Sequence, residues 1–320
     1  MEELLGKLLG GQVVSGQALS EEMGVTRAAV WKQVEQLRAQ GFAIESVGRQ
    51  GYRLTACPDS LLAPVIEQGL RTKWAGRPIV SLRTVDSTNR RARELAAQGA
   101  PEGTLVIAEE QTAGRGRRGR GWISPPGESI YMTLILRPDV HPSQVAGLSL
   151  QTALAVARAI DRQTGLAAAI KWPNDIVCHG KKVCGMLLEM NADEQSVHDV
   201  VAGIGINVHQ KRMPEEIEKT AASLDMLSGG VCSRAALVRA FLEEYEDVCA
   251  LAARGGLMAA YRERSATLGA RVQVIAPAGS FVGTAREITE SGSLLVEDEQ
   301  GRLREVLAAD VSVRGLMGYV

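Results

Sequence analysis

Apolar and polar positions along the first 54 residues change spacing several times, and each spacing predicts an element. Leu19 and Met23 are spaced as on one helix face, and Gly24 ends that helix. Thr26 stands where its side chain can cap the following helix. The last two segments alternate apolar and polar residues around a glycine-bounded turn. Three helices and two strands are therefore predicted, over residues 4–9, 15–23, 26–40, 42–47 and 52–54. This order is that of a winged helix-turn-helix.

A proline-containing linker follows, and the pattern then changes to alternating strands and helices. Pro58 ends the preceding strand, and Asp59 with Ser60 can cap a helix that begins near Leu61, so a domain boundary is expected here. Downstream, strands are predicted over residues 79–84, 104–110, 129–136, 168–171, 182–190 and 197–208, and helices over 87–98 and 144–164. The alternation predicts an α/β (α+β) catalytic domain with a mixed sheet.

The C-terminal segment consists of short apolar runs between glycine turns, over residues 269–275, 279–285, 294–298 and 311–313. Such runs predict a small SH3-like β-barrel. The chain has 320 residues, which is too long for one ordinary core because single domains hold about 100–200 residues. We therefore expect a winged helix-turn-helix over residues 1–60, a catalytic domain over 61–267 and a β-barrel domain over 268–320.

The composition excludes several classes of protein. No stretch reaches the roughly 20 apolar residues that cross a bilayer, so no membrane span is expected. The start is acidic at Glu2 and Glu3, where a secretory signal is basic, which favours the cytoplasm. The cysteines are five, scattered and without a CxxC pair, which favours reduced thiols over a disulfide framework or a zinc site: Cys57, Cys178, Cys184, Cys232 and Cys249.

The N-terminal domain is interpreted as a DNA-binding module. The helix-turn-helix, Gly16 to Glu35 and including Thr26, would place its second helix in a major groove, with Arg27 and Lys32 on phosphates or base edges and Arg49 at the wing tip. Against this, the formal net charge of the chain is -1, and winged helices also bind proteins. The basic residues gather in the second helix of the motif and the hairpin, which favours DNA over a protein partner.

Residues 114–122 form the sharpest chemical feature, in which four glycines alternate with four arginines. Gly114, Gly116 and Gly119 formally match the dinucleotide fingerprint GxGxxG, but Pro125 and Pro126 prevent a helix from opening there, so the match is judged false. Such dense positive charge is typical of a loop that closes around a phosphate or carboxylate, with guanidinium groups supplying paired contacts. The alternative is a solvated basic linker or an RNA-binding arginine-glycine tract.

A second constellation, Lys171-Trp172-Pro173-Asn174-Asp175, follows an apolar strand. A lysine at a strand end before a proline-fixed turn can hold an ammonium toward a phosphate, and the Asn-Asp pair can bind a hydroxyl or Mg²⁺. The alternative is an ordinary turn. Lys181 and Lys182 then enter the next strand, where a surface position would explain them equally well.

Taken together, these residues resemble the bacterial bifunctional biotin protein ligases and biotin operon repressors over essentially the whole chain. The ordered motifs are residues 85–89 (VDSTN), 110–122 (EQTAGRGRRGRGW), 171–175 (KWPND), 182–185 (KVCG) and 203–207 (GIGIN). One departure is Cys184, where a smaller residue such as alanine is common in the family. Lipoate ligases share the central fold but lack the arginine loop and the winged N-terminus.

The resemblance implies a role for each motif. A biotin pocket would be formed by Ser87, Thr88, Asn89, Gln111, Arg115, Gly116, Arg117, Lys182 and Gly185. ATP or the adenylate would be held by Arg117, Arg120, Trp122, Lys171, Asn174 and Asn207. Arg117, Lys171 and Lys182 would be catalytic, and Mg²⁺ would arrive with ATP, with no metal fixed by the protein.

The resemblance also implies an activity and its partners. The enzyme would convert biotin and ATP to biotinyl-5'-AMP and transfer biotin to a lysine of the biotin carboxyl carrier protein of acetyl-CoA carboxylase. The adenylate would be the corepressor of a homodimer that binds operator DNA of biotin genes. Two alternatives remain: a ligand-sensing transcription regulator without ligase activity, and a lipoate-type ligase.

Overall fold

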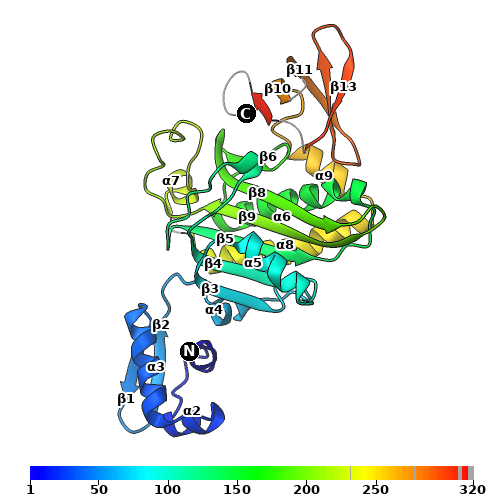
Figure 1. Cartoon of the computed structure of the whole chain (residues 1–320). Coiled ribbons are helices and arrows are strands. Elements are labelled where there is room, and N and C mark those ends of the chain that lie inside the picture. Colours follow the sequence, from blue (N-terminus) through cyan, green and yellow to red (C-terminus); the bar gives the residue numbers. More distant parts are fainter. Residues whose placement is uncertain (231, 277–278, 309–311, 316–320) are drawn as a thin grey trace. The chain divides into compact units, whose positions relative to one another are not determined.

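The computed structural model describes residues 1–230, 232–276, 279–308 and 312–315, which fold into two compact units (Figure 1). The first unit comprises Met1–Leu70 with Ser233–Ala235, and the second comprises Arg71–Cys232 with Ala236–Val320. The first unit thus extends past residue 60, while the boundary expected there stays a prediction.

The first unit is a winged helix-turn-helix followed by a short helix. Its elements are α1 (Glu2–Leu8), α2 (Gly16–Glu22), α3 (Arg27–Ala39), the antiparallel hairpin of β1 (Ala43–Val47) and β2 (Gly51–Ala56), and α4 (Ala63–Glu67). The predicted cap is confirmed, since Thr26 Oγ1 accepts a hydrogen bond from the backbone N–H of Ala29 at 3.2 Å. Buried leucines and valines at helical spacing form the core: Leu4, Leu5, Leu8, Leu19, Val30, Val34 and Leu37.

The predicted cap of the linker helix is wrong. Helix α4 begins at Ala63, after Leu62, with no side-chain cap. The Asp59 carboxylate instead accepts hydrogen bonds from the backbone N–H of Arg234 at 2.9 Å and from its Nε at 2.5 Å. The Arg234 side chain is only 3% exposed, and a buried guanidinium is costly unless it is paired. The ion pair with Arg234 therefore outweighs the preference of Asp59 for capping the nearby helix.

A seven-stranded mixed sheet forms the centre of the second unit. Its strand order is β3-β4-β5-β9-β8-β7-β6; β3 and β4 are parallel and the other neighbours are antiparallel. The strands are β3 (Ile79–Val85), β4 (Leu105–Gln111), β5 (Ser129–Leu136), β6 (Ala169–Lys171), β7 (Asp175–Cys178), β8 (Lys181–Ala192) and β9 (Val197–Asn207). The mixed sheet expected from the sequence is confirmed.

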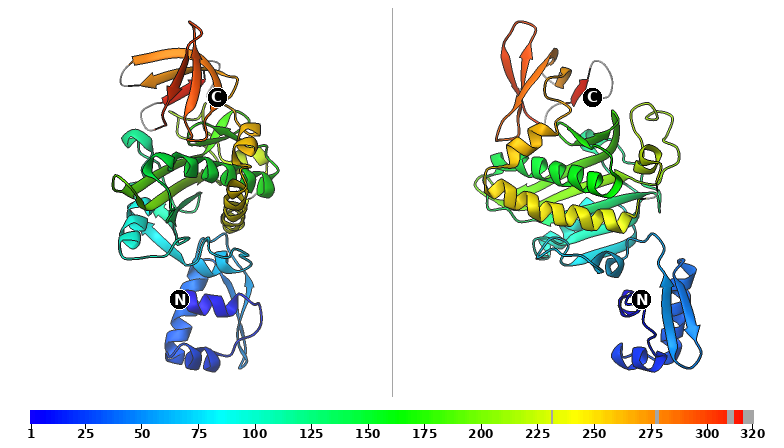
Figure 2. Two further views of the ribbon diagram at one scale, coloured as in Figure 1. Left: turned by 90° about the vertical axis from the view of Figure 1, so that its right-hand side faces the viewer. Right: turned by 180° about the vertical axis from the view of Figure 1, so that it is seen from behind.

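Helices cover both faces of this sheet. Figure 2 shows α6 (Ala146–Thr164) and α8 (Arg234–Ala253) side by side on one face, and in Figure 1 α5 (Thr88–Ala97) lies on the other. Shorter helices are α7 (Leu224–Ser228) and α9 (Leu257–Glu263), and 3-10 turns span Arg117–Gly119 and Pro142–Gln144. On the α5 face, a buried cluster joins helix and strands: Ala92, Ala96, Val106, Ile135 and Val201. This packing fixes the N-terminus of α5 at the edge of the cavity described below.

The C-terminal part is a five-stranded antiparallel sheet. Its order is β13-β12-β11-β10-β14, from β10 (Arg271–Ala276), β11 (Gly279–Ile288), β12 (Leu294–Asp298), β13 (Leu303–Val306) and β14 (Ser312–Gly315). The C-terminal β structure expected from the sequence is confirmed as an antiparallel sheet, and the domain bounds expected for it, 268–320, stay a prediction. Of the last strand predicted, residue 311 lies outside the described residues. Within the described ranges, we find no helix long and apolar enough to span a bilayer.

Candidate active site

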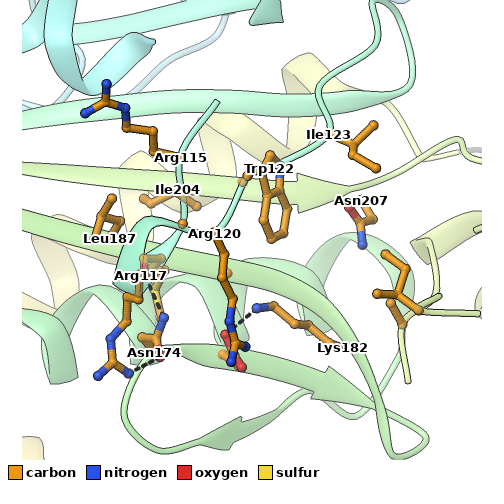
Figure 3. A pocket seen from close by; sticks show the side chains of 18 of the residues that line it. Arg115, Arg117, Arg120, Trp122, Ile123, Asn174, Lys182, Leu187, Ile204 and Asn207 are labelled. Carbon is orange, nitrogen blue, oxygen red and sulfur yellow. Dashed lines mark hydrogen bonds and ion pairs between the residues drawn. The ribbon is translucent and has the colours of Figure 1, made fainter. Parts of the chain in front are cut away.

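One cavity of 1370 Å³ opens in the second unit (Figure 3). Every residue to which the sequence assigned a biotin or nucleotide ligand lines it. Its walls come from the start of α5, the end of β4, the arginine loop, the turn at 171–175, strands β8 and β9, and the segment after β9. The predicted lining residues are Ser87, Thr88, Asn89, Gln111, Arg115, Gly116, Arg117, Arg120, Trp122, Lys171, Asn174, Lys182, Gly185 and Asn207. Motifs separated by up to 120 positions are thus brought to one place.

One end of the cavity is floored by neutral polar groups. Gln111 Oε1 accepts hydrogen bonds from the Thr88 backbone N–H at 2.9 Å and from the Thr88 hydroxyl at 3.1 Å. Gln111 Nε2 donates to Ser124 Oγ at 3.1 Å. The Asn89 amide donates to the Leu187 carbonyl at 3.1 Å. The Asn89 amide also donates to the Glu189 carboxylate, but Glu189 does not line the cavity. The side chains that line this end are uncharged, which suits a neutral, hydrogen-bonding ligand group.

Glycines of β8 and β9 allow side chains to lie flat on the sheet. A Cβ at Gly203 would stand 2.1 Å from Asn89 Oδ1, and a Cβ at Gly205 would stand 2.7 Å from the Trp122 ring. At Gly185 it would stand 2.9 Å from the same ring. Real Cβ atoms do not approach so closely, and these positions therefore require glycine. The 203–207 motif is explained by contacts with two other motifs.

The arginine loop is folded back on itself beside the cavity. The backbone N–H of Trp122 donates to the Gly114 carbonyl at 2.9 Å, and the backbone N–H of Gly116 donates to the Arg120 carbonyl at 2.8 Å. Arg118 has φ 56°, a left-handed conformation that is uncommon for a residue other than glycine. Within the loop only a 3-10 turn forms, which agrees with rejecting the dinucleotide fingerprint.

Arg117 is held from two sides. Its guanidinium donates to Asn174 Oδ1 at 2.8 Å, and a second nitrogen donates to the Ala308 carbonyl of the C-terminal part. Asn174 is itself fixed, because its Nδ2 donates to the Met186 carbonyl at 2.8 Å. Burial lowers the pKa of Arg117, and the nearby Asp175 carboxylate opposes this. The site therefore holds a partly desolvated cation in a defined position.

A second cation, Lys182, lies near the same Asp175 carboxylate. Lys182 Nζ lies 2.7 Å from Asp175 Oδ1 and 5.3 Å from the centroid of the Trp122 ring. Lys171 is buried with an exposed fraction of 6%. Figure 3 shows Arg117, Arg120 and Lys182 gathered around the Asn174 side of the site, whereas the Arg115 guanidinium points away from them. The cavity thus joins a neutral end to a cationic end.

Several residues of the site were not singled out from the sequence. Thr133 and Glu189 contact the floor from behind, and Arg212 and Lys219 line the cavity from the segment after β9. Thr133 lies between apolar residues in the middle of β5, and this local signal could have indicated a polar partner. Arg212 and Lys219 lie in an irregular segment with no periodicity to interpret.

In the first unit, α3 presents a polar face that includes Arg27 and Lys32, and Arg49 is exposed at the wing. The other basic residues of residues 1–54 form ion pairs: Lys7 with Glu22, Arg38 with Glu35, and Arg53 with Glu45. Across the described residues, no ion pair engages Arg27, Lys32 or Arg49. The positive charge of this nearly neutral unit is therefore left at the positions expected to contact DNA.

Three segments of the chain match known protein families. Residues 81–207 match the biotin/lipoate A/B protein ligase family, residues 2–53 match an HTH domain, and residues 267–314 match the biotin protein ligase C-terminal domain. The bifunctional ligase/repressor BirA of Bacillus spizizenii is 38% identical over 95% of both chains, and that of Escherichia coli is 28% identical over 98% of this chain and 96% of its own.

A solved relative has the same fold. The biotin protein ligase of Aquifex aeolicus, in complex with biotin and ATP, matches with a TM-score of 0.65 and 30% identity, covering 75% of this chain and 99% of its own. Fold and site define a ligase joined to a DNA-binding module. The chain belongs to the biotin/lipoate A/B protein ligase family, in the branch of the bifunctional ligase/repressors. Biotin ligation and a repressor role are both supported.

Proposed function

We propose that this chain is an ATP-dependent biotin protein ligase that forms biotinyl-5'-AMP, transfers biotin to a lysine of the biotin carboxyl carrier protein of acetyl-CoA carboxylase, and represses biotin genes. The observation that carries the proposal is that one cavity holds both a floor of neutral polar side chains and a group of cations. Its volume of 1370 Å³ exceeds the roughly 300–1,000 Å³ of a site for one small ligand, so two substrates fit.

Biotin lies at the neutral end. Ser87, Thr88, Asn89 and Gln111 form the floor that receives its ring, and Gly185, Arg115 and Gly116 border the tail. The carboxylate then points toward Arg117 and Lys182, of which Lys182 Nζ lies 5.3 Å from the centroid of the Trp122 ring. This arrangement places the reactive group of biotin at the boundary between the two ends of the cavity.

ATP lies at the cationic end, with Arg117, Arg120, Trp122, Lys171, Asn174 and Asn207 around it. A carboxylate and a triphosphate repel each other, so cations must neutralise both before the carboxylate oxygen attacks the α-phosphorus and pyrophosphate leaves. Arg117 and Lys182 supply fixed positive charge where the two substrates meet, and Lys171 supplies it in a buried position where its field is little screened. These three residues are the proposed catalytic groups.

Mg²⁺ enters with the nucleotide. No group of three or more histidines, cysteines, aspartates or glutamates that could hold a metal occurs within the described residues. The Asp175 carboxylate in the cavity offers oxygens that suit Mg²⁺ already bound to phosphates. When bound, the ion neutralises phosphate charge in the transition state.

The second step transfers biotin to the carrier. The acceptor lysine amine attacks the carbonyl carbon of the mixed anhydride, and AMP leaves. Positioning and the exclusion of water account for this step, since no enzyme nucleophile is required. Burial raises the pKa of the Cys178 thiol to about 12 and that of the Cys249 thiol to about 11, so neither is suited to nucleophilic attack. The arginine loop covers the adenylate.

The first unit carries the regulatory role. Arg27 and Lys32 on α3 and Arg49 at the wing contact operator DNA, and two half-sites are bound by a homodimer that forms when the adenylate is present. This requires the adenylate to bind the dimer more tightly than the monomer. We place the enzyme in the cytoplasm, where carrier protein and DNA are both accessible.

The test is pyrophosphate release from ATP by the purified full chain in the presence of biotin, lipoate or octanoate, followed by mass spectrometry of an added carrier domain. Biotin-dependent release with a biotinylated carrier is expected. Release with lipoate alone would favour a lipoate-type ligase, and no release with any acid would favour a ligand-sensing regulator.

A further inference from the structure

A chain of hydrogen bonds runs behind the neutral floor of the cavity and ends at residues that do not line it. Thr133 is fully buried in β5, and its Oγ1 lies 2.8 Å from Asn89 Oδ1 and 2.8 Å from Thr88 Oγ1. Glu189 of β8 accepts a hydrogen bond from Asn89 Nδ2 at 2.7 Å. Thr133 and Glu189 therefore support the floor from the side away from the ligand.

The acceptors around Asn89 fix the direction of its amide. Nδ2 faces two groups that only accept, the Glu189 carboxylate and the Leu187 carbonyl. The oxygen Oδ1 consequently faces Thr133, which must donate its only hydroxyl proton to it. Both hydrogens of the Asn89 amide are thus donated to protein groups. Asn89 therefore affects the hydrogen-bonding pattern of the floor through its bond with Thr133.

The same constraint passes to the residues that face the ligand. With the Thr133 proton committed to Asn89, the Thr88 hydroxyl donates inward, to Thr133 or to Gln111 Oε1, and its lone pair faces the cavity. Gln111 Oε1 is held by the Thr88 backbone N–H, and Nε2 donates one hydrogen to Ser124 Oγ at 3.1 Å, which leaves the second Nε2 hydrogen for the ligand. An acceptor and a donor thus lie side by side on the floor.

We propose that Thr133 and Glu189, which do not line the cavity, are positioning residues that fix the direction of the Thr88 hydroxyl and thereby the acceptor-donor pattern that the floor presents to the biotin ring. An N–H of a cyclic urea meets the Thr88 oxygen, and its C=O meets Gln111 Nε2. A dithiolane or an alkyl chain offers no such partners, and either would leave the floor groups desolvated and unpaired. The proposal rests on biotin occupying the neutral end as proposed above.

Matched variants of Thr133 separate the hydroxyl from the packing. Thr133→Val keeps the shape and removes the hydroxyl, whereas Thr133→Ser keeps the hydroxyl. In biotin-dependent pyrophosphate exchange with the full chain, Thr133→Val should raise the KM for biotin and for dethiobiotin about tenfold, the effect expected for one lost buried hydrogen bond. The KM for ATP should stay unchanged, the biotin-over-lipoate preference should fall, and Thr133→Ser should restore the wild-type values.

Glu189 gives a second pair of variants in case Thr133→Val fails to fold. Glu189→Gln keeps an acceptor oxygen for Asn89 and should behave as wild type, whereas Glu189→Leu frees the amide to turn and should reproduce the rise in KM. Arg93, 3.7 Å from Glu189 on the solvent side, gives a control, and Arg93→Ala should leave the KM for biotin unchanged.

The positioning role is overturned if the wild-type enzyme is active and both Thr133→Val and Glu189→Leu keep the wild-type KM for biotin. Wild-type enzyme inactive with biotin would instead overturn the proposed function.

Discussion

At the residue scale, Arg117 is the side chain on which most of the proposed chemistry converges. It donates hydrogen bonds to Asn174 Oδ1 and to the Ala308 carbonyl, and it lines the cavity. Arg117→Ala should make the adenylate leak from the site about tenfold or more faster, because a charged hydrogen bond to the ligand contributes about 1.5–3 kcal/mol. Stopped-flow or filter-binding measurement of adenylate dissociation checks this.

The matched variant is Asn174→Ala, which removes the side chain that orients Arg117 and should change adenylate retention in the same direction. Both variants should melt close to the wild-type temperature, since the loop contributes little to the core. Wild-type retention of the adenylate together with wild-type affinity for biotin in Arg117→Ala would remove Arg117 from the proposed machinery.

Gly205 gives a second prediction at this scale. An added methyl group would stand 2.7 Å from the Trp122 ring, so Gly205→Ala should displace the indole, weaken the binding of both substrates and shift the tryptophan fluorescence. Gly121→Ala is the control, because a Cβ there meets no atom within 4 Å. Equal fluorescence and equal substrate affinity in Gly205→Ala and wild type would show that Trp122 does not lie on β9.

At the scale of elements, one carboxylate ties a loop to a helix. Glu246 of α8 accepts hydrogen bonds from the backbone N–H groups of Lys73, Trp74 and Ala75, at distances of 2.7–3.0 Å. Burial acts to raise the pKa of Glu246, but these hydrogen bonds outweigh it and the pKa is lowered. The loop that precedes β3 is thereby joined to the helix that covers the sheet.

This lowered pKa predicts a pH dependence of stability. A carboxyl group with a lower pKa in the folded state stabilises the fold fully above its unfolded pKa of about 4.3, and that contribution is lost as the pH falls through the folded value. Glu246→Gln should therefore unfold at lower urea concentration than wild type at pH 7. The difference should shrink below about pH 4; a difference that is independent of pH would contradict the assignment.

At the scale of the whole molecule, the cavity and the DNA-contacting residues belong to different units. The lining residues all fall between Ser87 and Ala221, within the second unit. Deletion of residues 1–60 should consequently abolish DNA binding, measured by electrophoretic mobility shift, and spare biotin-dependent pyrophosphate exchange. Loss of exchange through unfolding would mean that the boundary near residue 60 is misplaced.

A control is needed because the deletion also removes Asp59, the partner of the buried Arg234. In the full chain, Asp59→Ala should lower the melting temperature, since removing one partner of a buried ion pair costs about 3–5 kcal/mol. It should leave the KM for biotin unchanged. The comparison separates the loss of this ion pair from the loss of the DNA-binding unit.

The sequence by itself determined the elements and the motifs. The helical spacing of the N-terminal leucines, the cap at Thr26 and most strands of the central sheet were predicted correctly, because a local repeat of apolar residues is enough to define a helix or a strand. The arginine loop was recognised from its composition alone. Helices α7, α8 and α9 and strands β7 and β13 were not predicted.

The missed elements have physical reasons. Helix α8 has buried residues on most of its circumference, including Leu237, Phe241, Leu242 and Tyr245, so its sequence lacks a clear polar face. Strand β7 is only four residues long and directly follows the proline turn. In both cases the surroundings, and not the local sequence, define the element.

Only the tertiary structure decided which groups meet. Asn89 contacts Thr133, 44 positions away, and Glu189, 100 positions away, while Asp59 pairs with Arg234 at a separation of 175. Nothing in a local pattern encodes such pairs, because a hydrogen bond depends on the direction of donors and acceptors after strands from distant segments have packed. The residue types of the site can therefore be read along the chain, whereas the donor-acceptor pattern of its floor exists only in the fold.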